Sequence, residues 1–365
     1  MTKAAELAKM GEVLTNSQIG GRRNLIINGD MQVSQRGTSF TSNADLYTLD
    51  RFAIGHGSPV NAMTVSQETD APTGFKYSLK VLTGTGAGAS TGGYAILRQA
   101  IEGQDMYHLN FGTSSAKTIA ISFYIKSSLT GTFAVSIRNQ AGNRAFASTY
   151  TINSANTWEY KTILIAGDTS GTWATDNGIG LHVFFDLGAG SNFDIATGAW
   201  TAGSNMFGGE STVKLTETTN ATWFLTGLQL EVASQATPFE HRSFGEEKLL
   251  CGRYYQKKGG EQVYSVIGTG YNYTTDDAIL FVHLTPEMRA VPTLDHGTLS
   301  KITVTDNDAS REAIGALTIS TTDSRTGMAS LNANNITNDT LTAGDATTLI
   351  CNNDADGYAA FIAEL

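Results

Sequence analysis

Residues 117–127 alternate apolar and polar side chains along their whole length, the pattern of a β-strand with one buried face. The apolar face carries Ile119, Ile121, Phe123 and Ile125, and the other face carries Thr118, Ala120, Ser122 and Tyr124. Residues 132–138 and 181–187 repeat the alternation, and residues 222–232 shift it by one position at Gly227, which is typical of a β-bulge. Strands of this length between Gly- and Asn-rich turns predict a two-sheet antiparallel β-sandwich.

The composition agrees with an all-β fold. Charged residues make up 16% of the 365 positions, below the roughly 25% of average soluble domains. So few charges disfavour long solvated helices, which need many Lys and Glu residues on their outer faces. The 41% of hydrophobic residues excludes wholesale disorder. The length predicts two or three domains.

The net charge limits the classes of molecule that the protein is expected to bind. A net charge of −10 argues against nucleic acid and anionic membranes as general partners. No apolar run reaches the roughly 18–20 residues that a bilayer span needs, and residues 1–14 have no apolar core of signal-peptide type. Cys251 and Cys351 lie in apolar surroundings, so we expect two buried free thiols in a protein that folds in a reducing cytoplasm.

Two helices are expected among the strands. Residues 3–14 predict a short amphipathic helix whose apolar face carries Leu7, Ala8, Gly11 and Leu14. It is either a frayed terminus or an anchor to a neighbouring subunit. Ser243 and Glu246 fit a capping box that opens a second helix. The expected organisation is a helix and linker over 1–23, a β domain over 24–245, a connecting helix over 246–258 and a smaller C-terminal β domain over 259–365.

Catalytic motifs are missing from the sequence. The six histidines lack the close spacings of a zinc site, and neither a nucleophile elbow nor a phosphate-binding glycine loop occurs. Asp186 and Asp194 could form a carboxylate pair or bind calcium, but solvation in a loop is the favoured interpretation. We therefore expect no catalytic residues and no enzyme.

Several segments, in a fixed order, carry a resemblance to a known family. They are NLIINGDMQV at 24–33, QRG at 35–37, YTLDRF at 47–52, GDTSGTW at 167–173, FDLGAGSNF at 185–193, TGLQLEV at 226–232, ATPFE at 236–240 and CGRYY at 251–255. Over residues 24–257 the chain resembles the carbohydrate-binding-module-like jelly roll in structural and tail-fibre proteins of tailed bacteriophages. Residues 287–293 and 363–365 resemble the short β domain that often follows it.

The resemblance implies a virion component of the phage tail, assembled in the host cytoplasm with other virion proteins. Our first interpretation is a homotrimeric tail fibre or receptor-binding subunit that contacts host-surface glycans, without nucleic-acid binding or membrane insertion. A purely structural virion protein, such as a head decoration or tail adaptor, is the alternative. A depolymerase would need an acid pair that the sequence does not offer.

The family often holds a structural calcium ion near a first strand like Asn28-Gly29-Asp30. Its usual acidic pair in the last strand is replaced here by Leu228-Gln229, ahead of Glu231. The prediction is therefore no cofactor and no metal site, with a structural calcium as the alternative.

Aromatic side chains bind sugars by stacking on pyranose rings. Trp173 and Trp200 in Gly- and Thr-rich loops, and Tyr271 and Tyr273 in the C-terminal part, are the glycan-binding candidates, with a structural or interface role as the alternative for each. Trp158 and Trp223 sit inside strand patterns and are expected in the core. The net negative charge favours a neutral or cation-bridged glycan over a strongly acidic polymer.

Overall fold

The computed structural model describes residue 3 and residues 22–57, 61–204, 207–211, 213–306, 311–337, 341–354 and 356–365. The chain forms two compact units, residues 1–244 with Leu365 and residues 245–364. The attachment helix expected at Leu7, Ala8, Gly11 and Leu14 lies outside the described residues. Within the described ranges, no helix combines the length and apolar character that crossing a bilayer requires.

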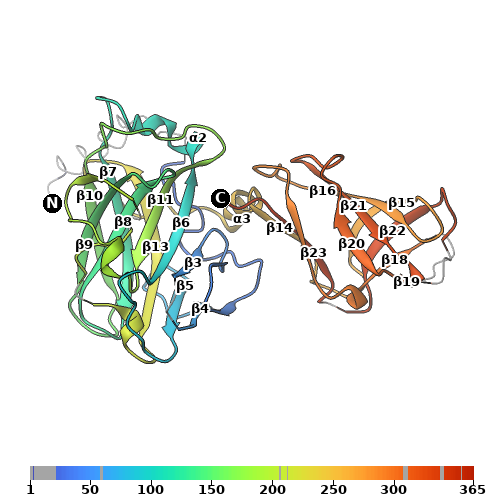
Figure 1. The fold of residues 1–365 in the computed structure, drawn as a ribbon, viewed down its shortest axis with the longest axis horizontal. Helices are drawn as coiled ribbons and strands as arrows, with labels where there is room; N and C mark the ends of the chain where they lie inside the picture. Colours follow the sequence, from blue (N-terminus) through green and yellow to red (C-terminus); the bar gives the residue numbers. More distant parts are fainter. Residues whose placement is uncertain are drawn as a thin grey trace. The chain divides into compact units, whose positions relative to one another are not determined.

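The first unit is a β-sandwich of two antiparallel sheets (Figure 1). Among the described residues, its first sheet has six strands in the order β1-β4-β5-β13-β7-β10. Their bounds are β1 Ser39–Ser42, β4 Met63–Glu68, β5 Ser78–Thr83, β13 Thr222–Val232, β7 Ile119–Ser127 and β10 Glu159–Ile165. The late strand β13, yellow in Figure 1, pairs with both β5 and β7, so the first sheet is completed only by the end of the unit.

The second sheet has seven strands in the described part of the chain, in the order β12-β9-β8-β11-β6-β3-β2. Their bounds are β12 Trp200–Ala202, β9 Arg144–Ile152, β8 Gly131–Asn139, β11 Ile179–Asp186, β6 Tyr94–Glu102, β3 Ala53–Gly57 and β2 Leu46–Tyr47. Four short helices lie in the connections: α2 Gly103–Met106, η1 Tyr107–Leu109, η2 Ser191–Phe193 and η3 Leu215–Glu217. The predicted all-β sandwich is confirmed.

The core lies between the two sheets and is built from the apolar face of each alternating strand. Ile121 and Phe123 of β7 pack in one cluster with Val135 of β8, Phe185 of β11 and Trp223 of β13. Each of these side chains is at most 2% exposed. Burying one such side chain contributes about 1.5–3 kcal/mol. The apolar faces that the alternating pattern creates on the two sheets therefore stabilise the sandwich by packing against each other.

The predicted bulge in β13 is confirmed at Gly227. The pairing of β13 with β7 shifts between Thr226 and Gln229, and Gly227 has φ +62°. A Cβ atom at Gly227 would lie 2.7 Å from Cζ of Phe75. Glycine is therefore required twice over, for the left-handed backbone and for the close approach of Phe75.

The second unit begins with α3 Phe244–Gly252 and contains two antiparallel sheets in its described residues. The smaller sheet has the order β14-β23-β17, with bounds β14 Tyr255–Gly259, β23 Tyr358–Ile362 and β17 Thr293–His296. The larger sheet runs β19 Arg311–Ala313, β18 Ile302–Thr305, β22 Ala346–Cys351, β15 Val266–Asn272, β16 Ala278–His283, β21 Met328–Asn334 and β20 Ala316–Ile319, and η4 Leu299–Lys301 precedes β18. Side chains from both sheets form a separate apolar core.

The connecting helix is shorter than the predicted 246–258. It ends at Gly252, and Tyr255–Gly259 form β14 instead, paired with β23 from Tyr255↔Ile362 to Gly259↔Tyr358. The predicted helix extended over these residues because basic residues such as Lys257 and Lys258 favour the last turn of a helix. Pairing with a strand about a hundred residues later outweighs this local preference, and no local pattern in the sequence points to that partner.

The two cysteines are buried and form no disulfide in the described structure, as predicted. The Cys351 thiol lies at the end of β22 and donates a 2.8 Å hydrogen bond to the carbonyl oxygen of Gly357. Cys251 lies in α3. Both are 0% exposed, so each packs as a small apolar residue.

Candidate functional site

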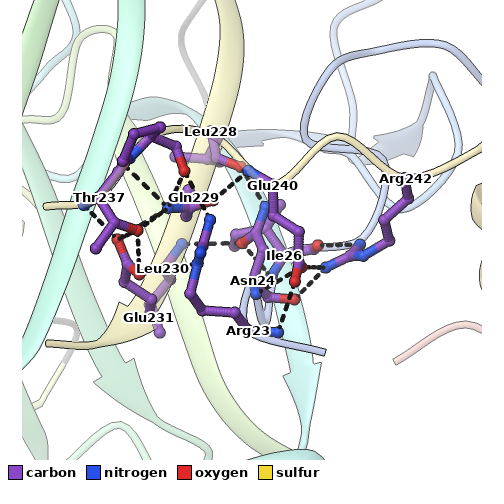
Figure 2. A network of polar contacts seen from close by, with 11 residues as sticks. Arg23, Asn24, Ile26, Leu228, Gln229, Leu230, Glu231, Thr237, Glu240 and Arg242 are labelled. Atoms are coloured by element: carbon purple, nitrogen blue, oxygen red, sulfur yellow. Dashed lines mark hydrogen bonds and ion pairs between the residues drawn. The ribbon is translucent and has the colours of Figure 1, made fainter. Parts of the chain in front are cut away.

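Three of the segments that carry the family resemblance, 24–33, 226–232 and 236–240, meet in one polar network, which we call the closing network (Figure 2). The labelled residues are Arg23, Asn24, Ile26, Leu228, Gln229, Leu230, Glu231, Thr237, Glu240 and Arg242. The Asn24 amide donates to the Leu228 carbonyl oxygen at 3.0 Å, and its oxygen accepts 3.0 Å bonds from the backbone N–H groups of Ile26 and Leu230. Asn24 therefore joins the segment before the first strand to the second half of β13.

Glu240 and Arg242 extend this network from the other side. The Glu240 carboxylate accepts hydrogen bonds from the backbone N–H groups of Arg23 at 3.0 Å and Asn24 at 2.9 Å. The Arg242 guanidinium donates to the Ile26 carbonyl oxygen at 3.1 Å and to Glu240 at 3.0 Å. Burial tends to raise the pKa of Glu240, but the two backbone N–H groups and Arg242 outweigh it and lower the pKa below its ordinary value. The side-chain oxygens of Asn24 and Glu240 accept hydrogen bonds from the protein's own N–H groups, which fits a structural role better than a binding role.

The residues near Asn28-Gly29-Asp30, the position of the alternative calcium site, do not fit the metal. Asp30 is 5% exposed, and its Oδ1 has no hydrogen-bond partner among the described residues, so one carboxylate oxygen could face a cation. The Glu231 carboxylate is occupied, because Thr237 N and Gln229 Nε2 each donate to Oε1 at 2.8 Å. The Arg23 guanidinium also lies 3.2 Å from Glu231 Oε2. Calcium takes roughly six to eight oxygen ligands, and one available carboxylate oxygen falls far short. In the described ranges no three His, Cys, Asp or Glu side chains form a metal-binding group.

Asp186 is not solvated in a loop, so that interpretation is wrong for this residue. It is 0% exposed, and its Oδ1 accepts bonds from the backbone N–H groups of Gly188 at 2.9 Å and Ala189 at 2.7 Å. The Lys214 ammonium lies 3.1 Å from Asp186 and 3.7 Å from Asp194. The two aspartates thus share one lysine and fix the loop after β11.

Two of the four predicted glycan-binding residues sit in an aromatic cluster at the end of the sandwich. The Trp173 ring lies 5.0 Å from Phe111 and 5.5 Å from Trp200, with edge-to-face geometry. Trp173 is 8% exposed although it lies in a Gly- and Thr-rich loop, because Phe111 and Trp200 from distant positions cover it. Trp200 is partly buried and its indole N–H donates to the Ala166 carbonyl oxygen at 2.7 Å. Glycan contact by either ring stays a prediction.

Tyr271 and Tyr273 are exposed, at 40% and 63%. Tyr271 lies in β15 opposite Ile279 of β16 and Ala346 of β22, and Tyr273 follows in the turn to β16. Both belong to the second unit. The structure therefore leaves these two candidates available but does not bring them together with the tryptophans in one unit.

A group of aromatic rings that the sequence did not single out lies on the outer face of the first sheet. We call Phe239, Phe75, Tyr124 and Tyr160 the aromatic row, since ring centroids are 5.1 Å, 5.4 Å and 4.9 Å apart in that order. Tyr124 and Tyr160 face each other across β7 and β10. Tyr160 is 45% exposed, and the other three rings are partly buried. The bulge at Gly227 admits the Phe75 ring at the centre of the row.

Polar and charged groups flank the aromatic row on the same sheet. The Lys126 ammonium lies 4.3 Å from the Phe224 ring centre and 5.1 Å from that of Trp158. Lys126 also pairs with Asp70, whose other oxygen accepts a 3.2 Å bond from the Trp158 indole. The hydrogen bond from Lys126 lowers the pKa of Asp70. Trp158 is only partly buried, so its expected place in the core is wrong, while Trp223 is buried as predicted.

A local signal could have pointed to half of the aromatic row. Tyr124 stands on the polar face of its alternating strand, where an aromatic ring has no core to fill. Tyr160 holds the matching position on the next strand of the sheet. Phe75 and Phe239 come from loops far apart in the sequence, and no pattern announces that they meet.

Comparisons with known proteins give structural likenesses only. No family model matches the chain, and no curated protein matches it. A tailspike domain of bacteriophage CBA120 is 15% identical over 57% of this chain and 21% of its own, with a TM-score of 0.31. A family 11 carbohydrate-binding module from Clostridium thermocellum, solved with a mixed-linked tetrasaccharide, is 15% identical over 56% of this chain and 98% of its own, with a TM-score of 0.27. A protein from Bacteroides thetaiotaomicron, whose description is "putative sugar binding protein", is 12% identical over 58% of this chain and 100% of its own, with a TM-score of 0.33. The chain spans about a fifth of the tailspike chain that it matches.

Proposed function

We propose that this chain is a non-enzymatic glycan-binding protein, and that the aromatic row is its binding surface. The observation that carries the proposal is the row itself, in which four rings follow one another on the outer face of a sheet. Contiguous apolar surface on an outer face is typical of interaction sites and ligand-binding grooves. Sugar rings present apolar C–H faces that stack on aromatic rings.

The flanking residues supply the polar part of such a site. Lys126 and Asp70 can bond to sugar hydroxyls beside the rings, and the exposed His241 lies 5.2 Å from Phe75. A few placed polar groups beside an apolar surface are the usual composition of a ligand site. One stacked ring contributes about 0.5–1.5 kcal/mol, so a single copy would bind weakly and several copies would bind through avidity.

The virion role rests on the sequence resemblance. We propose that the glycan-binding unit belongs to a phage tail fibre or receptor-binding subunit, assembled as a homotrimer with other virion proteins. Immunogold labelling of intact particles tests the position, and labelling of the head would favour the decoration-protein alternative. Analytical ultracentrifugation of the full chain tests the trimer, and a monomer at micromolar concentration contradicts it.

The binding surface is tested by screening the full chain on a glycan array and then titrating the strongest glycan by calorimetry. Tyr160→Ala and Tyr124→Ala should each weaken that binding by about two- to twelvefold, the loss of one stacked ring. Tyr107→Ala is the matched control, because Tyr107 is 69% exposed in η1, outside the aromatic row, and should bind as the wild type does. No glycan bound by the wild type, or unchanged binding by both row variants, would overturn the proposal.

A further inference from the structure

The outer face of the second sheet carries a group of cationic and polar side chains from three neighbouring strands. His182 of β11 is directly opposite Arg138 of β8, and Phe184 of β11 is directly opposite Arg98 of β6. Because Val183 and Phe185 point into the core, His182 and Phe184 point outward, as do the residues opposite them. We call Tyr94, Arg98, Arg138 and His182 the arginine patch.

Arg138 has no acidic partner among the described residues. Its guanidinium lies over the rings of Phe184 at 4.9 Å and Phe207 at 5.7 Å, so its position is set by stacking. Its Nε is buried without a hydrogen-bond partner in the described structure. A stacked guanidinium keeps its edge free to donate two parallel hydrogen bonds to a carboxylate or sulfate.

His182 adds a buried donor site beside this guanidinium. It is 6% exposed, its ring stacks 5.1 Å from Phe184, and its Nδ1 has no hydrogen-bond partner among the described residues. A buried unpartnered ring nitrogen costs free energy unless a ligand or water satisfies it.

Arg98 and Tyr94 complete the patch. Arg98 lies 3.3 Å from the exposed Asp45, the one acidic residue that pairs with the patch in the described structure. The Tyr94 ring is held between Phe193 at 5.1 Å and Phe207 at 4.9 Å. Burial and Asp45 raise the pKa of the Tyr94 hydroxyl, while Arg98 and Arg138 act in the opposite direction.

The arginine patch carries more positive than negative charge, since its two arginines have one acidic partner, Asp45, in the described structure. Burial and the proximity of Arg98 lower the pKa of Arg138. Burial, Arg138 and Arg98 lower the pKa of His182 to about 3, so the imidazole is neutral at pH 7. This local excess of positive groups contrasts with the net charge of −10 of the whole chain.

We propose that the arginine patch binds the anionic group of an acidic sugar, a carboxylate or a sulfate ester. The two arginines would hold the anion, and the Tyr94 hydroxyl and His182 would donate to it or to a neighbouring hydroxyl. This second site lies on the opposite sheet from the aromatic row and does not depend on it. It also reverses the expectation of a neutral glycan, because the local field at the patch outweighs the distant net charge.

The experiment titrates the full chain with three probes at low salt: an oligoglucuronate, a sulfated oligosaccharide and the uncharged gluco-oligosaccharide of equal length. At least one anionic probe should bind tenfold or more tightly than the neutral one, and its affinity should fall as salt is raised. Whichever anionic probe binds better identifies carboxylate or sulfate as the natural group.

Arg98→Gln and Arg138→Gln should each weaken the anionic probe at least tenfold. Lys80→Gln is the control, since Lys80 is a partly exposed cation of the first sheet, 3.6 Å from Glu68. Melting temperatures exclude unfolding, and Arg98→Gln provides a second variant if Arg138→Gln fails to fold. In the wild type, the bound anion should raise the pKa of His182 in an NMR titration, which a merely structural patch would not do.

Equal affinity for charged and neutral probes, or variants that bind as the wild type does, would overturn the proposal. If Tyr160→Ala loses binding of the neutral glycan but still binds the anionic probe, the arginine patch and the aromatic row are separate sites. The two proposals therefore fail independently.

Discussion

The side-chain oxygen of Asn24 accepts a 3.0 Å hydrogen bond from the backbone N–H of Leu230, a residue 206 positions later. This contact ties the beginning of the first unit to its last strand. Asn24 is 1% exposed, so the bond is shielded from water. Closure of the sandwich thus depends on polar groups that have no alternative partner in the solvent.

Asn24→Ala should therefore destabilise the first unit strongly. The change leaves the N–H groups of Ile26 and Leu230 and the carbonyl oxygen of Leu228 without the bonds that Asn24 provides. We expect a loss of about 2–4 kcal/mol in the free energy of unfolding, measured by urea denaturation. Asn61→Ala, which removes one exposed 2.8 Å bond to Thr85, should cost less than about 1 kcal/mol. Equal losses would contradict the role of the closing network.

Gly227→Ala should destabilise the unit more than Gly198→Ala does. Gly227 has φ +62° and a Cβ there would lie 2.7 Å from Phe75, whereas Gly198 has φ +86° with nothing within 4 Å. Backbone strain costs each variant about 1–2 kcal/mol, and the clash should add about 1–3 kcal/mol at Gly227 alone. Thermal and urea unfolding measure the difference. If glycans bind the aromatic row, Gly227→Ala should also weaken binding, because Phe75 must move.

His182 should make the protein less stable as the pH falls. Its pKa is lowered to about 3 in the folded chain by burial and by Arg138 and Arg98, against an ordinary value of 6.5. Between these values the unfolded chain binds a proton that the folded chain does not, so stability is complete above about pH 6.5 and is lost towards about pH 3. His182→Gln should remove this dependence. Between about pH 7 and pH 4, the free energy of unfolding of the wild type should therefore fall by on the order of 2–3 kcal/mol more than that of the variant.

Urea unfolding at several pH values tests the prediction for His182. His283→Gln is the control, since His283 is exposed at the end of β16. An unchanged pH dependence in His182→Gln would contradict the prediction, because it would mean that the pKa of His182 is the same in the folded and the unfolded chain.

Chelation should leave the stability unchanged. The Glu231 carboxylate already accepts bonds from Thr237 and Gln229, so Asp30 Oδ1 is the carboxylate oxygen left open at the alternative calcium position in the described structure. Differential scanning calorimetry with EDTA and with excess calcium should give melting temperatures within about 1 °C. A calcium-dependent rise of several degrees would contradict this interpretation of the closing network.

The sequence predicted the strands and their buried faces well, because each depends on local alternation. Residues 222–232 were expected as one strand with a slip at Gly227, and β13 has those bounds and that slip. The contacts of the sites were beyond prediction for the opposite reason. Glu240 bonds to the N–H of Arg23 across 217 positions, and no periodicity encodes such a pair.

Exposure of aromatic rings was the least predictable property. Trp173 lies in a polar loop, yet Phe111 and Trp200 cover it, because burial of a ring is decided by which distant segments meet it. Arg138 and His182 likewise belong to different strands, and only the register of β8 and β11 sets them side by side. Pairing, more than composition, determines where charge gathers on the outer faces.

The pairing of β14 with β23 has a consequence for how such chains can change. Tyr255 lies opposite Ile362, so the first and the last described strands of the second unit, β14 and β23, are adjacent. A domain whose two ends lie close together can be exchanged for another domain with little disturbance, because the replacement needs only short connections. Recombination at these two points would give the first unit a new companion while its own closing network, formed by residues before Ser243, stays whole.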